Sequence, residues 1–194
     1  MTATEEPRPR IAEIVLAHPA SAEELETLRT LLREYAAHLN ATTPGGKHVC
    51  LESYEKELAS LPGAYAQPEG TLLLAYLDGE PAGCVAVKRL NPQPPPETGE
   101  VACELKRLWV RPRFRGHGLG VRLVKAALRD AVAQGYTAAY LDTVPVQMES
   151  ATQIYRKLGF EPAKRYRATD LLSYLGDQAP EIVFLRRSLA DPLP

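Results

Sequence analysis

Six consecutive residues, Arg115-Gly116-His117-Gly118-Leu119-Gly120, carry three alternating glycines. An apolar run over residues 101–110 precedes them, and a helical spacing of apolar residues follows them. The first N–H groups of a helix have no partner within it and carry partial positive charge, and glycine lets an anion come close to the backbone. The stretch therefore predicts a turn between a strand and a helix that binds phosphate groups.

The spacing of these glycines argues against two common nucleotide-binding motifs. A P-loop ends in Gly-Lys followed by Ser or Thr, whereas Leu119-Gly120-Val121 stands here. The dinucleotide fingerprint G-x-G-x-x-G, counted from Gly116, meets Gly118 but finds Val121 in place of its third glycine. A tight turn without a ligand is the alternative, and three alternating glycines ahead of an apolar helix argue against it.

Outward from the turn, strand and helix patterns alternate along the chain. Asp78-Gly79 between two apolar runs predicts a hairpin, and Ser21 with Glu24 forms a capping box at the start of a helix. The expected strands are residues 11–16, 71–77, 83–90, 101–110, 138–144 and 182–189, and the expected helices are 21–40, 51–60, 119–132 and 150–158. This order predicts an α/β (α+β) fold, a mixed sheet of six or seven strands with helices on both faces.

The bulk composition limits the classes of protein to which the chain can belong. Its 194 residues, 45% of them hydrophobic, predict one globular domain over residues 1–194, with residues 1–9 as a loose tail. A formal net charge of -1 gives no general attraction to nucleic acid or to a membrane. No apolar run approaches the roughly 20 residues that span a bilayer, and the N-terminus has no signal-peptide pattern. The three cysteines lack a CxxC spacing, which favours a reducing, cytoplasmic setting.

Arg115, Gly118 and Gly120 satisfy the pattern Arg/Gln-x-x-Gly-x-Gly/Ala, and in this the chain resembles the GNAT superfamily of N-acetyltransferases. Three segments agree with the superfamily in order and spacing: LWVRP (residues 108–112), AAYLDTV (138–144) and ATQIYRKLGF (151–160). The resemblance covers residues 100–160, the expected acyl-CoA-binding core, and more loosely the hairpin before it. It implies a GNAT-like three-layer fold with a mostly antiparallel sheet that splays between strands 101–110 and 138–144.

The resemblance implies acetyl-CoA as the acyl donor, with no metal ion. The pantetheine arm would enter between the two splayed strands, and the backbone N–H groups of the turn would hold the pyrophosphate. The implied cofactor-binding residues are Leu108, Trp109, Val110, Arg113, Arg115, Gly116, His117, Gly118, Leu119, Gly120 and Tyr155. Met148 occupies the place at which many members of the superfamily carry an asparagine that touches the cofactor.

In the superfamily an amine attacks the thioester carbonyl directly, so one proton must leave the amine and one must reach the leaving thiolate. The resemblance assigns the first task to Glu104, acting directly or through water, and the second to Tyr155. Strand alternation places Glu104, Lys106 and Leu108 on one face of the sheet. A structural ion-pair partner is the alternative for Glu104, and a core aromatic is the alternative for Tyr155.

The expected function is transfer of an acetyl or other short acyl group from acetyl-CoA to a primary amine in a ternary complex. The acceptor, expected to be a small molecule, would lie between residues 21–60 and 162–180, where Arg165, Tyr166 and Arg167 could meet an acidic group. The expected partners are acetyl-CoA and this acceptor, without nucleic acid or membrane, and the chain would be a monomer or a homodimer.

Three other functions stay open. They are an acyl-CoA sensor without turnover, a protein N-acetyltransferase and a nucleic-acid-binding regulator. The last would use the local basic cluster Lys106, Arg107, Arg111, Arg113 and Arg115.

Overall fold

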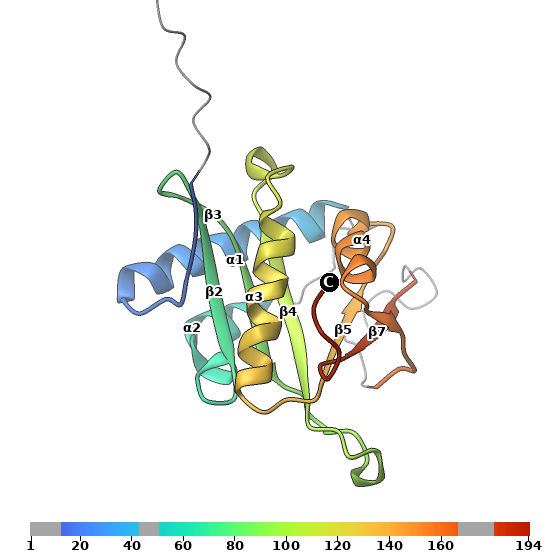
Figure 1. The fold of residues 1–194 in the computed structure, drawn as a ribbon. Coiled ribbons are helices and arrows are strands. Elements are labelled where there is room, and N and C mark those ends of the chain that lie inside the picture. Colours follow the sequence, from blue (N-terminus) through green and yellow to red (C-terminus); the bar gives the residue numbers. More distant parts are fainter. Residues whose placement is uncertain (1–12, 43–50, 167–180) are drawn as a thin grey trace, which may run out of the picture.

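A computed structural model describes residues 13–42, 51–166 and 181–194 of the chain. Ile11, Cys50, Arg167 and the predicted tail at residues 1–9 lie outside the described residues. In the described part, seven strands form one sheet with the order β1-β2-β3-β4-β5-β7-β6 (Figure 1). The strands are β1 Ile14–Ala17, β2 Thr71–Leu77, β3 Glu80–Arg89, β4 Ala102–Val110, β5 Ala138–Thr143, β6 Glu161–Pro162 and β7 Val183–Ser188.

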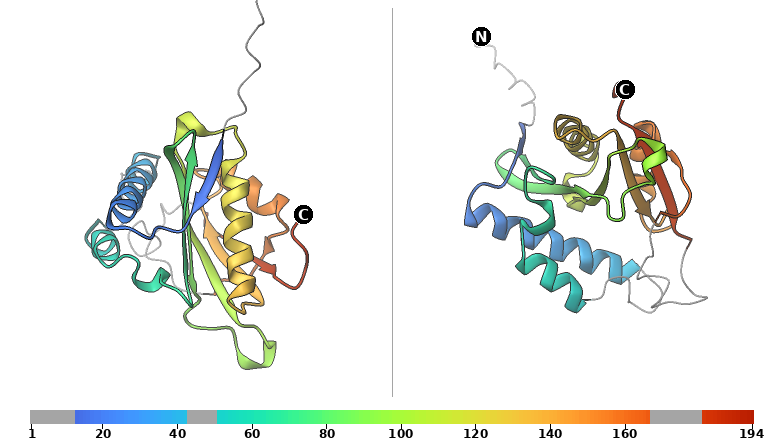
Figure 2. Two further views of the ribbon diagram at one scale, coloured as in Figure 1. Left: turned by 60° about the vertical axis from the view of Figure 1, so that its left-hand side comes forward. Right: turned by 90° about the horizontal axis from the view of Figure 1, so that it is seen from below.

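Helices cover both faces of this sheet. Among the described residues the α-helices are α1 Ala22–Thr42, α2 Leu51–Ala59, α3 Leu119–Ala133 and α4 Glu149–Lys157, with short 3-10 turns at η2 Gly63–Tyr65, η3 Pro96–Thr98 and η4 Pro112–Phe114. Helices α1 and α2 lie on one face, and α3 and α4 lie on the other (Figure 2). The predicted three-layer α/β class with a mostly antiparallel sheet is confirmed.

Each face of the sheet has its own apolar core. Leu128 of α3 packs with strand residues such as Leu105 on one side. Leu32 of α1 and Leu58 of α2 pack against the other side. Apolar burial is the main favourable term in folding, so these two layers hold the sheet at the centre of the molecule. None of the helices in the described residues has the length and apolar character needed to cross a lipid bilayer.

Local sequence signals explain where several elements begin. The predicted capping box is confirmed, because the Glu24 N–H donates to Ser21 Oγ at 3.1 Å and the Ser21 N–H donates to Glu24 Oε2 at 3.0 Å. Asp78 and Gly79 turn the hairpin with φ angles of 51° and 80°. Since these two left-handed residues suffice for the turn, β3 begins at Glu80 rather than at residue 83 as predicted.

A bulge in β4 reverses the alternation of side chains along this strand. The pairing between β3 and β4 shifts register midway, so that β4 holds one residue more than β3 there. Leu105 and Leu108 consequently pack in the same core, next to α3. The prediction that Glu104, Lys106 and Leu108 share one face is therefore wrong, because the extra residue turns Leu108 to the opposite face.

Strands β4 and β5 run parallel and stay together only briefly. Their paired residues are Ala102↔Ala138, Cys103↔Ala139 and Glu104↔Tyr140. From Ala138 to Thr143, β5 pairs on its other side with β7. Beyond Glu104, the β5-facing edge of β4 has no strand partner in the described part of the chain. The predicted splay between these two strands is confirmed.

Candidate functional site

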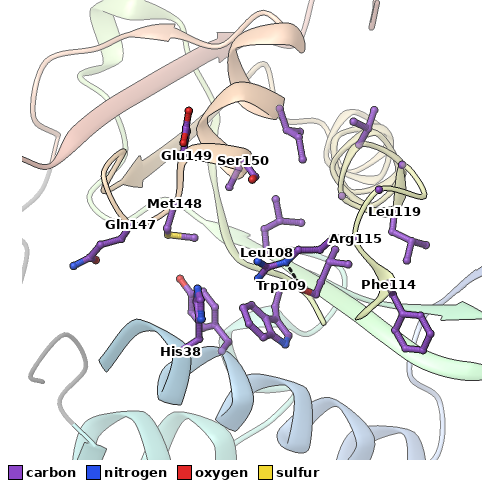
Figure 3. A pocket seen from close by; sticks show the side chains of 18 of the residues that line it. His38, Leu108, Trp109, Phe114, Arg115, Leu119, Gln147, Met148, Glu149 and Ser150 are labelled. Atoms are coloured by element: carbon purple, nitrogen blue, oxygen red, sulfur yellow. Dashed lines mark hydrogen bonds between the residues drawn. The ribbon is translucent and has the colours of Figure 1, made fainter. Parts of the chain in front are cut away.

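A cavity of about 430 Å³ lies at the end of β4, where this strand has parted from β5 (Figure 3). Its walls come from the end of β4, the glycine turn with the start of α3, the segment that leads into α4, and α1. The lining residues are Tyr35, His38, Leu108, Trp109, Val110, Phe114, Arg115, Gly116, Gly118, Leu119, Gly120, Val121, Val146, Gln147, Met148, Glu149, Ser150, Ala151 and Ile154. Segments far apart in sequence thus meet at a space of the size that binds small molecules.

The glycine turn brings the start of α3 to this cavity. Gly116 and Gly118 have φ angles of 86° and 74°, at which a side chain would be strained. No side chain caps the helix at Gly118, and the Arg122 N–H donates to the Gly118 carbonyl at 3.1 Å. Among the described residues, none accepts a hydrogen bond from the backbone N–H groups of residues 119–121. These donors are therefore available to an anion at the edge of the cavity.

Gly120 has a different role, because it lets α3 approach α4. A Cβ atom at this position would lie 2.7 Å from Cδ1 of Ile154, closer than carbon atoms pack. Ile154 and Ala151 of α4 line the cavity. The close contact between the two helices therefore closes this side of the site.

Arg115 and His38 both lie close to the Trp109 ring in the cavity. Figure 3 shows the Arg115 side chain above Trp109, with His38 rising from α1. The Arg115 Nε–H donates to the Val110 carbonyl at 3.2 Å, and its guanidinium carbon lies 5.2 Å from the centre of the Trp109 ring. The His38 ring centre lies 5.1 Å from that of Trp109. Partial burial, and then the positive charge of Arg115, lower the pKa of His38, so its imidazole is neutral at neutral pH.

Three of the predicted cofactor contacts, Arg113, His117 and Tyr155, lie outside the cavity wall, and the first two are on the surface. Arg113 is exposed, and its Nη2–H donates to Glu80 Oε2 at 2.6 Å. His117 is also exposed, and its Nδ1 lies 3.1 Å from the Arg115 carbonyl oxygen. Both side chains belong to the rim of the turn, whereas the backbone of the turn faces inward.

Tyr155 follows the cavity residue Ile154 in α4, but its own side chain is 4% exposed and packs in the core next to α3. Its ring meets Phe160 edge-on, with 5.7 Å between ring centres. Burial raises the pKa of Tyr155, and the nearby Tyr35 and Asp142 act in the same direction. The phenol is therefore protonated at neutral pH, the state that an acid requires.

Glu104 does not line the cavity and is 1% exposed. Its carboxylate lies 3.6 Å from Lys88 Nζ and 3.5 Å from Lys106 Nζ. The Tyr166 hydroxyl donates to Glu104 Oε1 at 3.1 Å. The structure thus contains the ion pairs that were the alternative interpretation of Glu104, on the face of the sheet opposite α3.

The sequence analysis did not identify several residues at or near the site, among them Tyr35, His38 and Asp142. Tyr35 and His38 form the α1 wall, and their spacing of three residues puts them on one face of a helix. No local pattern, however, shows where α1 crosses β4. Asp142 was also missed: its Oδ1 lies 3.7 Å from Lys106 Nζ, across the point where β4 and β5 part. The sequence did offer a signal for Asp142, because it is a carboxylate near the end of the expected strand 138–144, within the expected acyl-CoA-binding core.

Met148 lines the cavity just before α4, across from His38 in Figure 3. It occupies the N-cap position of this helix and makes no side-chain capping bond. A thioether is only a weak hydrogen-bond acceptor, so Met148 contributes an apolar contact where an asparagine would offer hydrogen bonds.

A three-layer α/β fold with an opened sheet has, at the opening, a glycine turn and an uncapped helix start, which together suit a phosphate-bearing ligand. The chain belongs to the acetyltransferase (GNAT) family, whose sequence profile matches residues 29–160.

Relatives agree with this family and fold. An uncharacterized N-acetyltransferase of Schizosaccharomyces pombe is 30% identical over 169 residues, which cover 87% of this chain and 90% of that protein. An acetyltransferase of the GNAT family from Staphylococcus aureus has a similar structure, with a TM-score of 0.68, 18% identity, and coverage of 91% and 99% of the two chains. PaiA N-acetyltransferase from Thermoplasma acidophilum, solved in complex with coenzyme A, matches with a TM-score of 0.62, 18% identity, and coverage of 91% and 99%.

Proposed function

We propose that the protein transfers an acetyl group, or another short acyl group, from acetyl-CoA to a primary amine of a small-molecule acceptor. The observation that carries this proposal is one continuous cavity, lined both by the start of α3 and by β4 beyond its last pair with β5. Family membership and the coenzyme A complex of a structural neighbour support the same donor. Residues 1–194 would act as a single domain.

The residues present fit a CoA thioester. The pyrophosphate would accept hydrogen bonds from the free N–H groups at the start of α3, and the pantetheine amides would pair with the backbone of Leu108 and Val110. The Val110 carbonyl now accepts from Arg115, so this side chain would exchange that bond for one to the pyrophosphate. Arg113 and His117 would add contacts at the rim. Trp109 and Tyr155 would pack on either side of the pantetheine arm.

The chemistry follows from the position of each group. Acetyl-CoA supplies the acyl group as a thioester; a C–N bond forms as the amine attacks, and the C–S bond breaks. Tyr155 would give its proton to the departing sulfur, since its phenol is held protonated. Glu104 would take the amine proton through water, because it lies outside the cavity wall, next to Lys106. Asp142, bound to the same lysine, adds a second carboxylate at this point.

A small acceptor fits the size of this site. Tyr35 and His38 of α1 cover the side of the cavity opposite α3, and the total space is about 430 Å³. A pantetheine arm and a small amine would share such a volume, which leaves little room for a peptide. Arg165 and Tyr166, at the end of the second described range, would lie on the acceptor side of the site.

Two measurements test the proposal. Titration calorimetry with acetyl-CoA should show binding, and thiol release across a panel of amines and amino acids should show turnover with some of them. Binding without thiol release for any amine would favour a non-catalytic acyl-CoA sensor, an alternative to which Met148 at the usual asparagine position gives support. Folded protein with no affinity for any CoA thioester would overturn the proposal as a whole.

A further inference from the structure

The β4 bulge is built around one residue with unusual backbone geometry. Arg107 has a φ angle of 62°, in the left-handed region that non-glycine residues rarely adopt. It sits at the register shift between β3 and β4. A conformation of this kind persists only where surrounding contacts hold it.

The contacts that hold Arg107 come from α2 and the turn that follows it. Its Nε–H and Nη2–H donate to the two carboxylate oxygens of Glu57 at 3.0 and 2.7 Å. The Tyr65 hydroxyl donates to the same carboxylate at 2.7 Å, and the guanidinium carbon lies 4.7 Å from the centre of the Tyr54 ring. Burial alone would raise the pKa of Glu57, but the Arg107 guanidinium holds it below its usual value. The pair is therefore ionised, bidentate and largely enclosed.

This ion pair lies directly before the part of β4 that lines the cavity. The next three residues, 108–110, all line it. Because the bulge adds one residue, Leu108 faces the α3 side, whereas Trp109 faces α1. A regular strand would exchange these two directions. The orientation of this backbone, and of its N–H and C=O groups, thus depends on the bulge.

We propose that Arg107 and Glu57 act as a positioning pair, which fixes the β4 bulge and thereby holds the backbone of Leu108 and Val110 in the orientation that an acyl-CoA arm needs. This inference rests on the proposed function. It gives α2, which contributes no residue to the cavity wall in the described part of the chain, a specific part in cofactor binding. Neither residue touches the reacting atoms.

A buried ion pair could instead serve stability alone, and the two roles predict different results. Arg107→Gly separates them, because glycine adopts the positive φ without strain but removes the guanidinium. Glu57→Gln keeps the shape of the side chain and removes its charge. Arg33→Ala is the matched control, because Arg33 makes an equivalent two-point contact with Glu55, at 3.2 and 3.0 Å, between α1 and α2 but on the exposed surface.

The readouts are the calorimetric Kd for CoA and the hydrogen exchange of the Trp109 and Arg111 amides in the free protein, both well below the thermal midpoint. These two residues follow the bulge directly and pair with β3, at Cys84 and Ala82. For Arg107→Gly and Glu57→Gln we expect Kd to rise by at least about tenfold, since small misplacements of binding groups are costly. We also expect faster exchange at the two amides. Arg33→Ala should stay within about twofold of the wild type, as surface substitutions do.

The possible outcomes are distinct. The inference would be overturned if Arg107→Gly folds and its Kd for CoA stays within about twofold of the wild-type value, even if its thermal midpoint is lower. The ion pair would then serve stability alone. If Arg107→Gly does not fold, Glu57→Gln decides by the same criterion. Wild-type protein that binds no CoA would instead refute the proposed function. The hydrogen exchange rates are measured without CoA, so they would still show whether the pair fixes the bulge.

Discussion

Ile154 and Tyr155 are consecutive residues of α4 with different surroundings. Ile154 lines the cavity, whereas Tyr155 packs against Phe160 in the adjacent core. Neighbouring helix residues point about 100° apart, so one helix can supply both a wall and a buried proton donor. The proposed acid is thus protected from water, and burial raises its pKa, which keeps its proton in place.

Tyr155→Phe tests this role because it keeps the ring and removes the hydroxyl. We expect kcat to fall by about 100-fold, in the range of general acid catalysis, with little change in the Kd for CoA. Steady-state kinetics and calorimetry measure the two quantities. Tyr136→Phe is the matched control, a tyrosine that is buried in the same core and donates to the Glu69 carbonyl. Equal kcat values for wild type and Tyr155→Phe would show that Tyr155 only packs in the core.

His38 offers a second test at this scale. Its pKa is lowered by partial burial and by Arg115, so removing the guanidinium should raise it. We expect Arg115→Gln to raise the pKa of His38 in an NMR titration, and Arg113→Gln, whose side chain pairs with Glu80 instead, to leave it unchanged. CoA should also raise it, if the phosphates draw Arg115 away from the Trp109 ring. An unchanged pKa of His38 in Arg115→Gln would contradict the placement of Arg115 and His38 beside the Trp109 ring.

The lowered pKa of His38 also makes the stability of the folded protein depend on pH. The pKa of His38 is lower in the folded chain than in the unfolded chain, where it is about 6.5. As the pH falls through that value, the unfolded chain therefore binds more protons than the folded chain. The contribution of His38 to stability is therefore fully present above that pH and decreases below it.

At the scale of elements, the junction between β4 and α3 presents backbone N–H groups to the cavity. Gly116 and Gly118 take positive φ angles, and a Cβ atom added to either would meet no other atom within 4 Å. The space beside these glycines is therefore open, although their backbone is strained for other residues. An open, donor-rich surface of this kind suits a ligand that fills it.

Gly118→Glu places a side chain and a negative charge in this space. We expect the Kd for CoA to rise by at least about 100-fold, because the negative carboxylate would repel the negative pyrophosphate. Calorimetry measures the change. Gly99→Glu is the control, since Gly99 has a φ of 67° and open surroundings but lies in the loop before β4, away from the cavity. Equal loss of affinity in both variants would point to general strain rather than to this site.

At the scale of the whole molecule, the sheet separates two cores that are built from different buried residues. Leu32 of α1 is buried in one core and Leu128 of α3 in the other. Each leaves a cavity when shortened, and the cost depends on how far its own core can relax. Substitutions in the two layers should therefore act independently.

Leu32→Ala and Leu128→Ala should each lower the free energy of unfolding by about 2–5 kcal/mol. The double variant should lower it by the sum within about 0.5 kcal/mol, because the sites share no partners. Denaturant unfolding measures all three values. Val132→Ala, on an exposed position of α3, should change stability little. A double variant much less destabilised than the sum would show that the cores are coupled through the sheet.

The sequence by itself determined the features that depend on neighbours along the chain. Ser21 and Glu24 cap α1 because they lie three residues apart, and Asp78-Gly79 turns the hairpin because both residues accept positive φ. The turn before α3 was predicted for the same reason, since glycines at 116 and 118 and the helical periodicity after them are local. These signals sufficed for the fold class and for the turn at one end of the cavity.

Only the tertiary structure decided which side chains meet across the sheet. The bulge at Arg107 was not visible in the strand pattern, because its support, Glu57, lies fifty residues earlier in the chain. The bulge moved Leu108 to the face opposite Glu104, and the packing of α1 over β4 brought His38 to the cavity. Periodicity specifies the direction of a side chain within one element, whereas the partners of that side chain depend on how distant elements pack.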